Sequence, residues 1–96
     1  MTEAKIEKQI ETVVKKYLKG LRCRVFLFGS RATGRDRRFS DLDLGVLGKE
    51  KIPSHLMVKI KSDLENSSIP YKIDIVDFKR VSDEFRNLAL SKIKYL

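Results

Sequence analysis

One short stretch of this chain carries the residue types needed to bind a polyphosphate and a divalent cation. Gly29 and Ser30 directly follow an apolar run, and Asp41 and Asp43 stand one residue apart after ten intervening residues. A glycine–serine turn lets backbone N–H groups approach a phosphate closely, and paired carboxylates bind Mg²⁺. The spacing therefore indicates phosphoryl or nucleotidyl transfer.

The two aspartates fall on an expected strand over residues 41–47. Side chains alternate across a strand, so Asp41 and Asp43 share one face. The opposite face, which includes Leu42 and Leu44, is apolar. Aspartate is disfavoured inside strands, and metal binding gives a reason for its presence. On the acidic face, Gly45 is expected to leave room beside the pair.

A third carboxylate stands on another expected strand, over residues 71–78. There Asp74 faces away from the apolar Ile73 and Ile75. If the two strands are neighbours, Asp74 joins the pair, and two Mg²⁺ ions would relieve the repulsion among three acids. Asp77 has the opposite parity and lies near the strand end, so we interpret it as a cap or surface acid.

The positive charge of the chain is concentrated around this motif. The formal net charge is +8, and residues 22–40 contain six arginines against one acid. Arginine suits bidentate phosphate contact, and Arg31 stands next to the Gly-Ser turn. A solvated basic loop would have the same composition. Direct nucleic-acid binding is not favoured, because no interleaved aromatic residues accompany the charge.

Apolar periodicity predicts the elements that position these residues. The pattern indicates one α/β domain over residues 1–96, in the order α-β-α-β-α-β-α, with a small mixed sheet flanked by helices. Thr2 is expected to cap the first helix, which Gly20 ends, and Pro53 is expected to start another. The expected segments are a strand over 22–28, a short helix or turn over 30–36, strands over 41–47 and 71–78, a helix from residue 53 to about 66, and a last helix from Ser82 with Phe85, Leu88, Ala89 and Ile93 inward. We find no apolar run long enough to span a membrane and no signal peptide, so a cytoplasmic protein is expected.

The Gly-Ser turn followed by Asp-x-Asp resembles the motif of the nucleotidyltransferase superfamily that includes DNA polymerase beta. The compact length and the segments GSRATG, SDLDL and IDIVD are similar to its minimal, MntA-type members. The resemblance implies the nucleotidyltransferase fold. It also implies that Gly29, Ser30 and Arg31 bind nucleotide phosphates. Asp41, Asp43 and Asp74 would then be the catalytic, Mg²⁺-binding residues, with Asp74 helping to deprotonate the acceptor hydroxyl.

MntA-type proteins resemble antitoxins that transfer AMP from ATP to a tyrosine of a HEPN-domain toxin. The resemblance thus implies ATP as substrate, Mg²⁺ as cofactor and a HEPN-domain protein as partner. Two alternatives remain open. One is transfer to a small molecule, and the other is a non-catalytic subunit that binds nucleotide or covers its partner. The chain could form homo-oligomers or hetero-oligomers under each of these functions.

Overall fold

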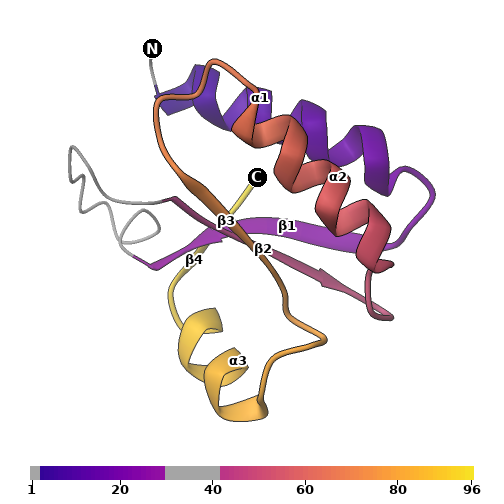
Figure 1. Cartoon of the computed structure of the whole chain (residues 1–96). Coiled ribbons are helices and arrows are strands. Elements are labelled where there is room, and N and C mark those ends of the chain that lie inside the picture. The colour runs from indigo at the N-terminus through magenta and orange to yellow at the C-terminus, as the bar shows by residue number, and fades with distance from the viewer. Residues whose placement is uncertain (1–2, 30–41) are drawn as a thin grey trace.

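The computed structural model describes residues 3–29 and 42–96 as three helices and one four-stranded sheet (Figure 1). The predicted α/β class with a mixed sheet is confirmed. Thr2 and the predicted helix or turn over residues 30–36 lie outside the described residues. The elements, in chain order, are α1 (Glu3–Leu18), β1 (Cys23–Phe28), β2 (Leu42–Gly48), α2 (Ser54–Glu65), β3 (Ile73–Asp77), α3 (Asp83–Leu90) and β4 (Ile93–Tyr95).

The strands lie in the spatial order β3-β2-β1-β4. β1 pairs antiparallel with β2 and with β4, whereas β2 and β3 are parallel. A parallel pair requires a crossover connection, and α2 supplies it. The crossover brings β3 alongside β2. The two strands that were predicted to carry the aspartates are therefore neighbours.

Two helices cover one face of the sheet, and α3 lies on the other side (Figure 1). The apolar residues of α1 recur every four positions, which aligns them along one face of the helix. They pack with α2 residues against the apolar face of β2, where Leu44 and Val46 are fully buried. Gly20 adopts φ +88° just after α1, which confirms the predicted helix stop. The buried α1 residues are Ile6, Ile10, Val14 and Leu18.

The opposite face of the sheet is filled by aromatic rings. Phe26 and Phe28 of β1 pack edge-on against Phe78, with ring centroids 4.9 and 5.2 Å apart. Ala89 and Leu90 of α3 pack against this cluster. Such edge-to-face pairs stabilise a core beyond the area that they bury. The second face therefore has its own small core, separate from the one beneath α1 and α2.

The prediction of one last helix continuing to the end of the chain is wrong. Ser82 caps α3 as expected, because its Oγ accepts a hydrogen bond from the Phe85 N–H at 3.1 Å. The helix nevertheless ends at Leu90, and Ile93 belongs to β4, which pairs with β1. Leu88, predicted to face inward, is 77% exposed. Pairing with a distant strand thus prevails over the local helical period.

The expectation that Gly45 leaves open space beside the acidic residues is wrong. A Cβ at this position would lie 2.4 Å from Phe26 Cε2 and 2.8 Å from Phe78 Cε1. The absent side chain is instead what allows the two rings to close over β2. The glycine is thus part of the aromatic core.

We expect Gly45→Ala to destabilise the protein by about 3 kcal/mol, because buried rings have no room to retreat from the added methyl group. Thermal unfolding followed by circular dichroism measures the loss. Gly20→Ala is the matched control, since nothing lies within 4 Å of a Cβ there and only the left-handed backbone is strained. Its expected cost is about 1 kcal/mol. Equal losses for the two variants would contradict the packing role of Gly45.

Candidate functional site

The structure describes three of the six predicted site residues and brings them together. Gly29 follows the end of β1, Asp43 lies near the start of β2, and Asp74 lies near the start of β3. The other three lie outside the described residues: Ser30, Arg31 and Asp41. The assignment of all six as site residues therefore stays a prediction, for which the positions of the first three can be examined.

Asp43 and Asp74 are register partners on the parallel strands β2 and β3. Partners on adjacent strands are separated by ~4.8 Å and present their side chains on the same face. Both residues are half-buried. The condition set by the sequence, that the two strands be neighbours, is met. Two carboxylates consequently lie side by side at one edge of the aromatic face.

Gly29 lies against the Asp43 carboxylate. It adopts φ +73°, a left-handed conformation that side-chain-bearing residues rarely enter. A Cβ at residue 29 would lie 2.6 Å from Asp43 Oδ2, closer than any real contact allows. Only glycine permits the turn after β1 and the Asp43 carboxylate to approach so closely. The predicted phosphate-binding turn and the predicted metal-binding acid thus belong to one place in the fold.

Phenylalanine rings lie on the same face of the sheet as Asp43 and Asp74. Phe28 immediately precedes Gly29 and is the register partner of Asp43. Its side chain packs against Phe78 and against Phe85 of α3. An apolar surround strengthens electrostatic interactions, because few water dipoles screen the charges. The pair is therefore suited to attract a cation.

The donor set fits Mg²⁺. Asp43 and Asp74 offer oxygen ligands on adjacent strands, and Mg²⁺ is bound in proteins by one or two carboxylates together with water and substrate phosphate. Within residues 3–29 and 42–96, no group of three or more acidic, histidine or cysteine side chains gathers around one point. The third predicted ligand, Asp41, lies outside that range. Two in-register carboxylates thus provide a partial site that the predicted third acid would complete.

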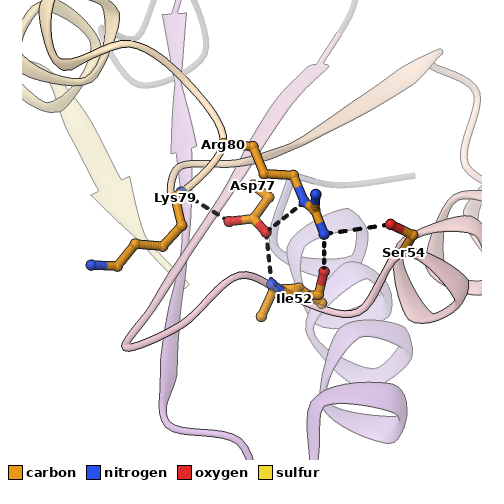
Figure 2. A network of polar contacts seen from close by, with 5 residues as sticks. All are labelled: Ile52, Ser54, Asp77, Lys79 and Arg80. Atoms are coloured by element: carbon orange, nitrogen blue, oxygen red, sulfur yellow. Dashed lines mark hydrogen bonds and ion pairs between the residues drawn. The ribbon is translucent and has the colours of Figure 1, made fainter.

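Asp77 is not a surface acid but a buried carboxylate at the centre of a polar network (Figure 2). Its carboxylate accepts hydrogen bonds from the backbone N–H groups of Ile52 at 2.7 Å and Lys79 at 2.9 Å. Arg80 Nε lies 3.3 Å from Asp77 Oδ2, and the same guanidinium donates to the Ile52 carbonyl. Asp77 therefore ties the end of β3 to the segment that leads into α2. The sequence predicted a cap or surface acid at Asp77 and did not predict its burial.

A pocket of about 650 Å³ opens elsewhere, between the end of α1 and the β1–β4 edge. Its lining includes one acid, Glu11, which already pairs with Lys15. Neither Asp43 nor Asp74 contributes to it. Since transfer chemistry needs the carboxylates, we place the candidate site at Asp43, Asp74 and Gly29 rather than in this pocket.

Comparison with known proteins places the chain in a family. Residues 8–96 match the family model described as polymerase beta, nucleotidyltransferase. The chain belongs to this nucleotidyltransferase family, which confirms the resemblance in the sequence.

A curated relative agrees with the family. The protein assigned as protein adenylyltransferase MntA in Haemophilus influenzae is 31% identical over 64 residues, which are 67% of this chain. The chain spans only 56% of the length of that relative.

Solved structures share the fold. A protein assigned as a minimal nucleotidyltransferase superposes with a TM-score of 0.79 at 28% identity, covering 100% of this chain and 97% of the other. A toxin–antitoxin structure with AMP-PNP gives 0.77 at 22% identity, covering 93% and 70%. The tri-AMPylated Shewanella oneidensis HEPN toxin in complex with MNT antitoxin gives 0.75 at 18% identity, covering 98% and 71%.

Proposed function

We propose that this chain transfers AMP from ATP to a hydroxyl group of a partner protein, with a tyrosine of a HEPN-domain toxin as acceptor. The observation that carries the proposal is the in-register pair Asp43 and Asp74 beside Gly29. Membership of the nucleotidyltransferase family supports the reaction type. The Haemophilus influenzae relative and the complex with a tri-AMPylated HEPN toxin support the protein acceptor.

In the proposed reaction, the acceptor oxygen forms a bond to the α-phosphorus of ATP while the bond from that phosphorus to pyrophosphate breaks. Gly29, with no side chain, lets the triphosphate approach the backbone beside Asp43. Asp74 accepts the proton of the acceptor hydroxyl, which makes the oxygen a better nucleophile. Bound Mg²⁺ would supply positive charge for the phosphate oxygens. Asp43 and Asp74 would hold it, with Asp41 as third ligand, and Ser30 and Arg31 would contact the phosphates.

No helix within residues 3–29 and 42–96 combines the length and apolarity that a membrane crossing would require. A cytoplasmic location and a single domain over residues 1–96 both stay predictions.

Labelled nucleotide tests the proposed function directly. The chain is incubated with Mg²⁺ and a HEPN-domain protein as candidate acceptor, with ATP labelled either at the α- or at the γ-phosphate. We expect the HEPN-domain protein to become labelled from the α-position only, because AMP is transferred and pyrophosphate leaves. Label from the γ-position would indicate phosphoryl transfer instead. Tight binding of the two proteins without any label would favour the non-catalytic, covering subunit.

A further inference from the structure

The pocket between the end of α1 and the β1–β4 edge lies away from the candidate site and has no part in the proposed function. Its volume of about 650 Å³ is within the range of small-molecule sites, roughly 300–1,000 Å³. Cys23, the first residue of β1, lines it, whereas Gly29 follows the end of the same strand. Six strand residues span about 20 Å, so the pocket and the carboxylates belong to opposite ends of β1 (Figure 1).

Apolar side chains from three elements form most of the pocket wall. Val14 and Leu18 of α1 also belong to the main core, whereas Leu21, in the turn that leads to β1, is 43% exposed. The wall therefore extends from the core to the surface, and an apolar group placed against it would be removed from water. The apolar lining residues are Val14, Leu18, Leu21, Cys23, Val25 and Leu96.

Two cations in the pocket lining lack an ionic partner. Glu11 and Lys15, which also line it, pair with each other. Neither Lys19 nor Arg24 forms an ion pair within residues 3–29 and 42–96. Arg24 lies 5.4 Å from the centroid of the Tyr95 ring, a contact that leaves its N–H groups able to donate. The side chains of the lining thus carry two unpaired positive charges and no unpaired negative one.

The charged groups and the apolar wall occupy different parts of the pocket. Lys19 and Arg24 are exposed, whereas Cys23 is half-buried. Burial raises the pKa of the Cys23 thiol, and the Asp77 carboxylate adds to the effect. The surroundings of the thiol are therefore poor in water, while the cations lie in it. This arrangement is complementary to a ligand that is apolar along its length and negatively charged at one end.

We propose that the pocket binds a small molecule that has an alkyl or aryl body and one carboxylate. The body lies against Leu18, Cys23 and Val25, and the carboxylate accepts hydrogen bonds from Arg24 and Lys19. A guanidinium suits this group, because its planar fork matches the two oxygens of a carboxylate. This binding site goes beyond the proposed function and does not depend on it.

Cys23 reports on occupancy, because it lines the pocket and is the only cysteine of the chain. Its alkylation by N-ethylmaleimide is followed by mass spectrometry, with decanoate or 2-naphthoate present below the concentration of micelle formation. We expect each carboxylate to slow alkylation by about fivefold or more at saturation. Decan-1-ol, which has the decanoate body without its charge, should require about tenfold more for half-protection, since it makes no charge-assisted hydrogen bond.

Arg24→Gln should raise the concentration of decanoate that gives half-protection by about tenfold, and Arg24→Lys by less, because the lysine keeps the charge. Protection by decan-1-ol should be the same in Arg24→Gln as in the parent chain, which separates loss of the anion contact from damage to the apolar wall. Lys61→Gln, at an exposed lysine of α2 outside the pocket lining, is the matched control and should leave decanoate protection unchanged.

Absence of protection by both carboxylates would overturn the proposal. Equal protection by decanoate and decan-1-ol would also overturn it, because the pocket would then take up apolar molecules without selecting a charge. So would an equal loss of decanoate protection in Lys61→Gln and Arg24→Gln, since the positive charge of the whole chain would then account for the selectivity. None of these measurements requires ATP, Mg²⁺ or an acceptor, so their outcome is independent of AMP transfer.

Discussion

Asp43→Asn and Asp74→Asn are each expected to lower the rate of AMP transfer by about 10³-fold or more. Each substitution removes one of two carboxylates that lie in register on adjacent strands. The loss reduces attraction for Mg²⁺, and in Asp74→Asn it also removes the group proposed to accept the hydroxyl proton. Transfer of α-phosphate label from ATP to the HEPN-domain protein measures the rate.

The free energy of unfolding should not fall together with the transfer rate. The two carboxylates repel each other in the absence of a cation, so neutralising one relieves repulsion. We expect the melting temperature of Asp74→Asn to stay equal or to rise slightly. Glu65→Gln, an exposed acid of α2, is the control for loss of charge and should retain full transfer. Undiminished transfer by Asp43→Asn would contradict the assignment of this pair as the catalytic site.

Asp77→Ala is expected to destabilise the protein by about 2–3 kcal/mol, the cost of leaving buried backbone donors without an acceptor. The Asp77 side chain is 1% exposed, and its loss leaves the Ile52 and Lys79 N–H groups without their acceptor. Because the network joins β3 to the segment before α2, the crossover should loosen as a whole. Urea unfolding followed by circular dichroism measures the change.

Asp83→Ala provides an unusually close control. Asp83 pairs with Arg86 three residues later, as Asp77 pairs with Arg80, and the two separations are 3.5 and 3.3 Å. The Asp83 side chain, however, is 89% exposed. Its removal should cost about 0.5 kcal/mol, since solvent screens the pair. Similar losses for the two variants would show that burial is not what makes the Asp77 network stabilising.

Local sequence patterns were sufficient to predict those helices and strands whose apolar residues recur at a regular spacing. The four-residue repeat of α1 and the alternation around Leu42 and Leu44 predicted a helix and a strand that the structure contains. The same alternation assigned Asp43 and Asp74 each to the face of its own strand that lies opposite the apolar residues, and the register of β2 and β3 makes the two residues neighbours. These features depend on neighbours a few residues away, which a sequence displays directly.

Features that depend on distant residues could not be predicted in this way. Three-residue β4 is stabilised by pairing with β1, and its apolar Ile93 also fits the helical period of α3. Asp77 is buried by Ile52, a contact across 25 residues. Gly45 is enclosed by Phe26 and Phe78 from other elements. In each case a tertiary contact, absent from the local pattern, determines the outcome.

The parallel pairing of β2 and β3 also has a consequence for when catalytic competence appears. Asp43 and Asp74 are 31 residues apart in the chain, and only the completed crossover through α2 brings them together. Pairings that close such long segments form late in folding, after local helices and hairpins. A partly synthesised or partly folded chain would thus lack the acidic pair entirely. Activity should emerge in a single step with the native state and not accumulate gradually during folding.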